Sequence, residues 1–267
     1  MTGTFLATWI TLRRRTLLWG TYATTAALLA LFTAVIFLNT SDSAATTQEG
    51  APPGAGVTRA DLVASGGLLQ GLTSGATFVG VIALSVAAAA VAGQYTTGTL
   101  RNLLIRQPRR LRLLAGTWAA LATFVVGAVL LAAVVAALVA VALAGPRDVD
   151  TSAWFTADAW GEHLRSVGQV ALSGLGFATL GAALGVLLRT SVLAVSLGLA
   201  WLLPVETILS GTIDDADRWL PGQLLAAVAS GGTATVSLAA ALTTVVAYVV
   251  VAAGAAGTSF VRRDVTA

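Results

Sequence analysis

Few side chains in this sequence are suited to chemistry. It contains no cysteine, one histidine (His163) and twelve acidic residues, and all fifteen basic residues are arginine. Without cysteine the chain has no disulfides and no thiolate metal sites. One histidine also leaves little from which to build a histidine-based metal centre or a catalytic triad. The sequence therefore predicts a chain that binds no metal or other cofactor and is not itself an enzyme.

One acidic residue, Glu206, lies within a long apolar stretch. A carboxylate in the hydrocarbon of a membrane is costly, so such residues often mark a transport pathway. Glu206 is close to the end of its stretch, however, and Pro204 loosens a helix at that point. We expect the carboxylate to reach interfacial water. The alternative is an outer gate formed by Glu206, Pro204, Leu220 and Pro221.

A second distinctive segment is GQYTTGTLRNLLIRQPRR, residues 93–110, which carries four arginines between two apolar stretches. Its threonines can cap a helix over residues 100–106, and Pro108 ends that helix. Leucines at i, i+3 and i+4 spacing share one face, which predicts a short amphipathic helix on the membrane surface. The charge alone fits a loop that fixes topology and contacts anionic lipid. The cap and the proline favour a docking element for a partner protein.

The elements that position these residues are membrane-spanning helices. The sequence is 57% hydrophobic and 10% charged, with a mean hydropathy of +0.86, whereas soluble domains are about 25% charged. Crossing the hydrocarbon layer takes about 20 apolar residues. The predicted fold is an all-α polytopic membrane protein with a single transmembrane domain and six spans. These cover residues 17–38, 71–92, 113–144, 167–188, 191–210 and 234–260.

The arginines predict the orientation of this bundle. Six spans put both termini on the same side as the 93–112 loop, and that side holds eleven arginines and one acid. The other side, with loops 39–70, 145–166 and 211–233, holds four arginines and ten acids. Because positively charged loops stay in the cytoplasm, both termini are predicted to be cytoplasmic. Charge segregation also explains the pI of about 10.2, so no nucleic-acid partner is expected.

The composition further indicates a bacterial plasma membrane. Arginine without lysine, together with abundant alanine, valine, glycine and leucine, is typical of a GC-rich bacterial genome. Membrane lipid is therefore an expected partner of the chain.

Several shorter segments have predicted roles at the membrane surface. Residues 5–18 combine large apolar side chains with three arginines and predict an N-terminal interfacial helix. Residues 58–61 carry a capping sequence for a helix start. Residues 223–230 are too short to span, so we expect a re-entrant or interfacial segment before the sixth span.

The outer loops supply further expectations. Trp154, Phe155 and Trp160 are plausible interfacial anchors. His163 and the acids at positions 214, 215 and 217 are expected to be solvated, because the acid cluster lacks the remaining ligands of a calcium loop. In the fourth span small residues repeat at a spacing that lets another helix approach closely. They are Gly174, Ala178, Gly181 and Gly185.

Two motifs resemble a known family of membrane proteins. Residues 94–101 (Gln-Tyr-Thr-Thr-Gly-Thr-Leu-Arg), followed by Pro108-Arg109-Arg110 and Leu113-Leu114, are similar to the cytoplasmic loop of type-2 permeases of ATP-binding cassette (ABC) exporters. Trp-Leu-Pro-Gly at residues 219–222 resembles the motif that often precedes the sixth span in that family. The Pro-Val-Glu of residues 204–206 resembles members with an acid in span five. Gln94 departs from the pattern, because the family has an acid there and glutamine can only hydrogen-bond.

This resemblance implies a permease subunit whose loop after the second span is a coupling helix inserted into a separate ATPase. The chain contains no G-x-x-x-x-G-K-[ST] motif, so it cannot supply a phosphate cradle of that type itself. ATP and Mg are thus expected on the partner ATPase. The residues that the resemblance implies for coupling are Gln94, Tyr95, Gly98, Thr99, Arg101, Arg106, Pro108, Arg109 and Arg110.

A second permease copy, or a homologous permease, would complete the transport path. The exported substrate is expected to be amphipathic, drug-like or lipid-like. Two alternatives remain open at this point: an ATP-independent secondary transporter or channel, which would need charged or broken helices near the midplane, and a non-transporting membrane scaffold.

Overall fold

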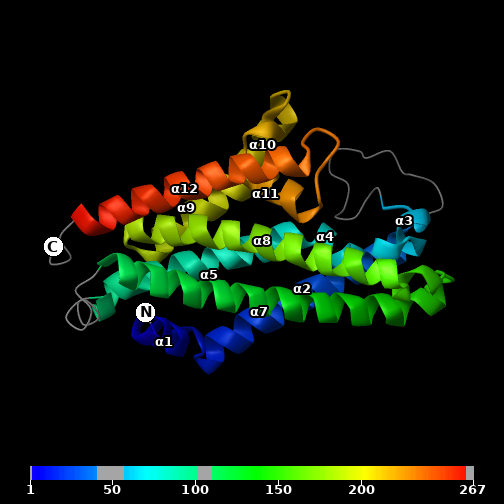
Figure 1. Ribbon diagram of the computed structural model, residues 1–267, viewed down its shortest axis with the longest axis horizontal. Coiled ribbons are helices and arrows are strands. Elements are labelled where there is room, and N and C mark those ends of the chain that lie inside the picture. Colours follow the sequence, from blue (N-terminus) through cyan, green and yellow to red (C-terminus); the bar gives the residue numbers. More distant parts are fainter. Residues whose placement is uncertain (1, 41–56, 101–109, 263–267) are drawn as a thin grey trace.

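The computed structural model describes residues 2–40, 57–100 and 110–262. Within these ranges the chain is largely helical and contains no β-strand, apart from one isolated bridge between Gly232 and Ser237. Six helices in the described ranges are long and apolar enough to cross a membrane. The predicted all-α fold and the number of helices able to span a membrane are therefore confirmed (Figure 1).

The six candidate spans have these bounds: α2 (Arg15–Asn39), α5 (Ala76–Thr96), α7 (Arg110–Ala144), α8 (Ala157–Leu188), α9 (Ser191–Ala200) continued by α10 (Glu206–Thr212), and α12 (Leu238–Arg262). A π-helical turn, η4 (Trp201–Val205), joins α9 to α10. The shorter elements are α1 (Thr2–Leu12), α3 (Arg59–Val63), η1 (Ser65–Leu69), α4 (Gln70–Ser74), η2 (Gly145–Arg147), η3 (Ser152–Phe155), η5 (Ala216–Arg218) and α11 (Pro221–Ala229).

Two spans begin five or more residues away from the start that the sequence predicts. The second begins at Ala76 rather than at residue 71, because a break at Gly75 separates α5 from the short helices η1 and α4. The fourth begins at Ala157 rather than at residue 167, where the side chain of Thr156 accepts a hydrogen bond from the Ala159 N–H. Charged residues in its first turns interrupt the apolar pattern but do not break a helix.

Helix α8 forms the centre of the bundle and packs against α5, α7, α9, α11 and α12. Its contact with α5 is very close. A Cβ on Gly181 would lie 2.2 Å from the carbonyl oxygen of Leu84, and one on Gly185 would lie 2.8 Å from that of Ala88. Gly174 faces α7 instead, where a Cβ would lie 3.0 Å from Val125. The predicted stripe of small residues thus serves two neighbouring helices, with the buried Ala178 between them.

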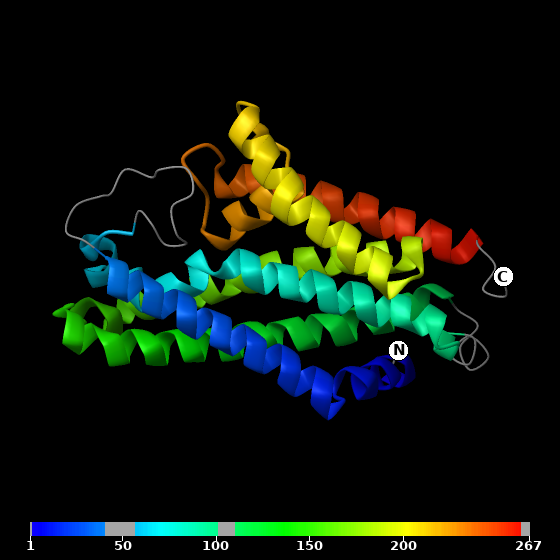
Figure 2. The same ribbon diagram turned by 180° about the vertical axis from the view of Figure 1, so that it is seen from behind.

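The start of α1 and the end of α12 lie at the same end of the bundle (Figures 1 and 2). The end of α5, the start of α7 and the α8–α9 turn lie at this end too, which we call the terminal end. The opposite end, where α7 passes into α8 through η2 and η3, is called the far end. The even number of candidate spans accounts for this arrangement.

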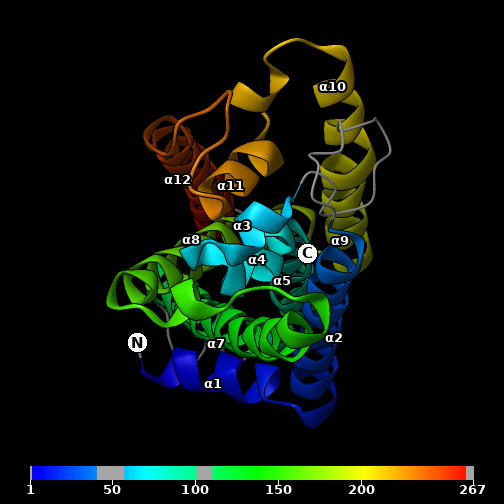
Figure 3. The same cartoon turned by 90° about the vertical axis from the view of Figure 1, so that its right-hand side faces the viewer.

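The N-terminal helix α1 lies along α7, on the side of the bundle opposite α10 and α12 (Figure 3). The hydroxyl groups of Thr8 and Thr117 are 3.4 Å apart across this contact, and Leu6 and Ile10 point away from the protein, with 52% and 68% of their surface exposed. The prediction of a separate N-terminal helix is correct. It ends at Leu12, however, and the predicted extent to residue 18 is wrong because α2 already begins at Arg15.

The fifth span is broken in its second half. Pro204 lies inside the π-helical turn η4, where proline cannot donate a backbone hydrogen bond. Helix α9 packs against α5 and α8, whereas α10 contacts mainly η4 and η5 and leaves the bundle. The predicted short segment before the sixth span is α11, which packs between α8 and α12.

Candidate functional site

The segment after α5 begins with a tight turn. Thr97 ends α5, and its hydroxyl donates to the carbonyl oxygen of Gly93 at 2.7 Å. Gly98 has φ +67°, a left-handed conformation that glycine adopts without strain, and a further helical turn begins at Thr99. Thr97 is one of the threonines expected to cap the helix over residues 100–106, but it caps the end of α5 instead. Arg101, Arg106, Pro108 and Arg109 lie outside the described residues.

The two ends of this segment are connected to other spans by a set of four residues, Tyr95, Arg110, Arg189 and Phe260, which we call the terminal cluster. Nη1 of Arg110, at the start of α7, donates to the carbonyl oxygens of Phe260 and Val261, at 3.0 Å each. A guanidinium that binds the last carbonyls of a helix stabilises its C-terminus. Arg110 therefore caps α12.

Tyr95 completes the terminal cluster from α5. The guanidinium of Arg189 lies over the Tyr95 ring, 5.4 Å from its centroid, and such cation–π contacts contribute about 0.5–2 kcal/mol. The edge of the Tyr95 ring meets Phe260 with 6.5 Å between centroids. Arg189 itself ends α8 with φ 58° and forms the turn to α9. The terminal cluster thus links α5, α7, α12 and the α8–α9 turn, with Gln94 half-buried beside it.

The carboxylate of Glu206 is buried, with 1% of the residue exposed, and has three hydrogen-bond donors. Trp201 Nε1 donates at 2.8 Å, the Gly222 N–H at 3.0 Å and the Gln223 N–H at 3.1 Å. The last two are free N–H groups at the start of α11, where a negative charge is favoured. The expectation that Glu206 reaches interfacial water is wrong, because these donors hold it inside the protein.

The other predicted gate residues surround the same carboxylate. Leu220, fully buried, precedes α11 at the N-cap position, and Pro221 occupies the first helical position, where its missing N–H costs nothing. A Cβ on Gly222 would lie 2.4 Å from the Glu206 carboxylate, so only glycine allows this approach. The structure therefore brings Glu206, Leu220 and Pro221 together, with Pro204 in the turn just before Glu206.

The sequence over residues 65–266 matches the model of a family described as "Protein of unknown function (DUF2705)", and this match covers more than half of the chain. The chain belongs to the DUF2705 family. No curated protein matches it. The match contains α5, the whole terminal cluster and the Glu206 contacts with α11, whereas α1 and α2 precede it.

At the far end of this DUF2705 protein, His163 and Trp154 are both buried. Trp154 is fully enclosed and donates from Nε1 to the carbonyl oxygen of Leu62 at 2.8 Å. His163, 5% exposed, donates from Nε2 to the carbonyl oxygen of Trp154 at 3.0 Å. The predictions of a solvated histidine and of Trp154 as an interfacial anchor are wrong. Phe155 and Trp160 do have the exposure that anchors need, 55% and 60%.

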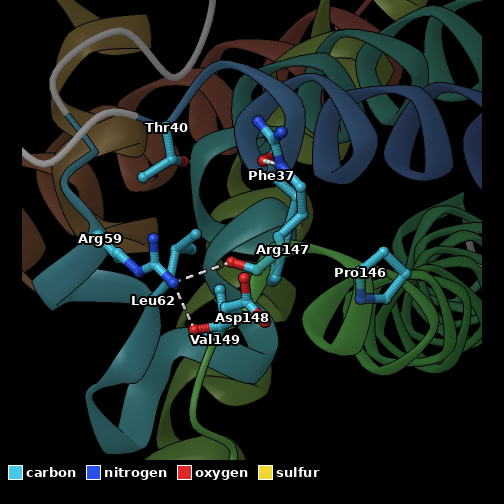
Figure 4. A pocket seen from close by; sticks show the side chains of 8 residues that line it. All are labelled: Phe37, Thr40, Arg59, Leu62, Pro146, Arg147, Asp148 and Val149. Carbon is cyan, nitrogen blue, oxygen red and sulfur yellow. Dashed lines mark hydrogen bonds between the residues drawn. The ribbon is translucent and has the colours of Figure 1, made fainter.

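Two arginines that no sequence motif marks, Arg59 and Arg147, hold the far end together. They line a pocket of about 240 Å³ together with Phe37, Thr40 and Asp148 (Figure 4). Arg147 donates to the carbonyl oxygens of Phe37 (2.8 Å) and Leu38 at the end of α2, and Arg59 donates to those of Arg147 (3.0 Å) and Asp148. Because they bind helix-end carbonyls, their role is to join α2, α3 and η2.

The remaining acids in the described ranges show no catalytic arrangement. Asp215 pairs with Arg218 at 3.2 Å, and both side chains are largely exposed. Asp150 accepts a hydrogen bond from the Ser152 N–H at 2.9 Å, which lowers the pKa of the Asp150 carboxyl below its ordinary value. Within the described ranges no three metal-ligating side chains come together. The candidate functional residues of this DUF2705 protein are therefore the terminal cluster and Glu206.

Proposed function

We propose that this DUF2705 protein is the membrane-spanning permease subunit of an ABC exporter. ATP and Mg bind to a separate ATPase chain, which docks on the segment after α5. The terminal end faces the cytoplasm of a bacterial plasma membrane, as the distribution of arginine favours. The six candidate spans, and the start of α1 and the end of α12 at one end of the bundle, support this proposal.

The terminal cluster is the observation that carries the proposal. The segment that would contact the ATPase leaves α5 just after Tyr95 and enters α7 at Arg110. Through these two residues it is connected to α12 and to the α8–α9 turn. A displacement of the segment would therefore act on several spans at once. A loop that only fixes topology needs charge but has no need of these contacts.

Transport follows as a two-state process biased by nucleotide. Closure of two ATPase subunits pulls the docked segments, and the terminal cluster passes the displacement to α12 and α9. At the other end of the fifth span, Glu206 connects the broken α9–α10 segment to α11. The fifth span, from α9 to α10, and α12 are the least buried candidate spans. Their surfaces are therefore suited to contact lipid, a second copy or a homologous permease.

Co-purification with the ATPase tests the docking. The neighbouring reading frame is expected to encode an ATPase with a Walker A motif. Replacing Arg106 and Arg109 with glutamate should reduce recovery of that ATPase about tenfold, because like charges then meet across the contact. Arg262→Glu, an exposed arginine at the end of α12, is the matched control and should leave recovery unchanged. Equal recovery with all three proteins would contradict the proposed docking site.

Proton-driven secondary transport is a second candidate, favoured by the buried Glu206 in a broken span. Transporters with discontinuous helices direct helix N-termini at their substrate. Here the Glu206 carboxylate itself occupies the N-terminus of α11, which favours a structural connection over a substrate site. Transport that needs a proton gradient and no ATP, and that Glu206→Gln abolishes, would favour this second candidate.

A further inference from the structure

The pocket that Arg59 and Arg147 share at the far end has a positively charged lining. Four arginines lie in the loops predicted for this side of the bundle, and two of them line this one pocket (Figure 4). Both are half-buried. Asp148 is the one acid of the lining, and among the described residues its carboxylate forms no ion pair. The charged side chains of the lining thus sum to a net positive charge, which favours an anion.

The guanidinium of Arg147 has donors left for such an anion. Its Nε and Nη2 donate to the carbonyl oxygens of Phe37 and Leu38, which carry no net charge. Among the described residues, Nη1 has no hydrogen-bond partner and no carboxylate pairs with this side chain. Nη1 is not one of the enclosed atoms without a partner, in contrast to Nδ1 of His163. A ligand can therefore reach its two hydrogens.

The pocket lies at the level where two candidate spans end. Residues at the ends of α2 and α7, and of η2 just after α7, line it. Leu38 of α2 and Val141 of α7, close to these ends, are 56% and 49% exposed and suited to face hydrocarbon. Phe155 and Trp160 at the same end are exposed aromatic residues, which gather at the level of lipid head groups. The pocket is thus placed beside head groups.

The size and chemistry of the pocket favour a phosphate group. Its volume of about 240 Å³ is below the roughly 300–1,000 Å³ of pockets that enclose drug-sized ligands. It therefore suits a small charged group better than a whole molecule. The planar fork of an arginine matches the oxygens of a phosphate, and every phospholipid carries a phosphate at the surface where α2 and α7 end.

We propose that this pocket binds the phosphate of a phospholipid from the leaflet at the far end. Nη1 of Arg147 donates to a phosphate oxygen, Arg59 supplies a second positive charge, and the acyl chains lie along the exposed apolar side chains of α2 and α7. Because Arg147 also holds the last carbonyls of α2, the bound lipid stabilises the junction of α2, α3 and η2. The site depends neither on an ATPase nor on the direction of transport.

Photolabelling of the protein alone tests the site. The full chain is purified in a maltoside detergent, which has no phosphate, and receives phosphatidylglycerol with a diazirine near the top of one acyl chain. Diacylglycerol with the same chains and diazirine is the matched probe without phosphate. Mass spectrometry should locate the phosphatidylglycerol label on residues 34–40 and 138–149, about tenfold above the diacylglycerol label at these positions.

A matched pair of variants at Thr40 separates charge from shape. Thr40 is half-buried in the lining, and its side chain is close in size to those of aspartate and asparagine. Thr40→Asp adds a negative charge beside the arginines and should reduce the far-end label about tenfold, because like charges repel. Thr40→Asn should leave the label within about twofold of the parent. Labelling at the terminal end is the internal reference and should be the same in both variants.

Asp148→Asn tests the site in the opposite direction and leaves both arginines in place. Asp148 has φ 52°, a left-handed conformation that asparagine also adopts, so this variant should fold even if the Thr40 variants do not. Removing the negative charge of the lining should raise the far-end label about threefold. Asp214→Asn, the same change at an exposed position between α10 and η5, should leave the label unchanged.

Glycerophosphoglycerol, which is phosphatidylglycerol without its acyl chains, identifies the source of the phosphate. If lipid is the ligand, this compound should compete only at millimolar concentration. Competition at micromolar concentration would overturn the assignment to lipid and show that the pocket takes a soluble phosphate compound. Equal far-end labelling by phosphatidylglycerol and diacylglycerol, or equal effects of Thr40→Asp and Thr40→Asn, would overturn the phosphate site itself. No ATPase is present, so failure of ATPase docking cannot produce any of these results.

Discussion

Arg110 and Phe260 connect the beginning of α7 to the end of α12: Nη1 of Arg110 donates to the Phe260 carbonyl oxygen at 3.0 Å. Hydrogen bonds to a charged group contribute about 1.5–3 kcal/mol. This contact joins two candidate spans that are far apart in the sequence. It also lies where the segment after α5 returns to the bundle, so we expect it to transmit force between that segment and α12.

Arg110→Gln is expected to uncouple ATP hydrolysis from transport. Loss of the cap should lower the free energy of unfolding by about 1–2 kcal/mol, and ATP hydrolysis by the complex should continue while transport falls. Thermal unfolding and ATPase assays of the purified complex measure the two effects. Arg112→Gln, an exposed arginine on the same turn, is the control. If the two variants show the same stability, ATP hydrolysis and transport, Arg110 does not transmit force from the segment to α12.

Glu206→Gln should detach the start of α11. The N–H groups of Gly222 and Gln223 donate to different oxygens of the carboxylate, and glutamine keeps only one oxygen, so its NH2 group would face one of these two N–H groups. Leaving that N–H group without an acceptor costs about 1–3 kcal/mol. Hydrogen exchange in α11 should therefore accelerate, whereas Glu162→Gln, at an exposed position of α8, should have no effect there. Unchanged protection of α11 in the Glu206 variant would show that the carboxylate does not hold it.

Gly181→Ala should strongly destabilise the bundle. Its Cβ would lie 2.2 Å from a backbone oxygen of α5, and a backbone atom cannot move aside as a side chain can. We expect a loss of about 3 kcal/mol in the free energy of unfolding. Gly168→Ala in the same helix meets nothing within 4 Å and should be neutral or stabilising by up to about 1 kcal/mol. Similar unfolding temperatures for both variants would contradict the close α5–α8 contact.

Gln94→Glu introduces the acid that stands at the corresponding position of the type-2 permease motif that residues 94–101 resemble. If that acid pairs with a basic residue of the ATPase, the variant should bind the ATPase several-fold more tightly, by about 1 kcal/mol. Affinity measured at low and high salt checks the ionic origin, because screening weakens such a pair. Weaker binding of the variant at low salt would indicate that residue 94 faces a negative charge instead.

The spans and several local motifs could be predicted from the sequence because their causes are local. The capping box of Thr58 and Asp61 forms as expected. The two residues left between the predicted fourth and fifth spans, Arg189 and Thr190, form the turn from α8 to α9. The apolar pattern likewise located all six candidate spans. Hydropathy and short-range spacing contain this information.

The environments of Glu206 and His163 could not be predicted in the same way. Two of the three donors to Glu206 are backbone groups of residues 222 and 223, on a different helix. His163 is buried where η1 and η3 pack against α8. Contacts between these separate segments are not indicated by the local sequence pattern. The roles of Arg59 and Arg147 also depend on helix ends that only the folded chain brings together.

Site-directed crosslinking tests the central claim most directly, since the chain has no cysteine and any introduced one is unique. Thr99→Cys places a thiol at an exposed position at the start of the proposed docking segment, and Thr212→Cys places one at an exposed position at the end of α10. Each is modified with a photoactivatable maleimide in membranes that contain the ATPase. The account predicts an adduct with the ATPase from position 99 and none from position 212. No adduct from position 99, or equal adducts from both, would contradict it.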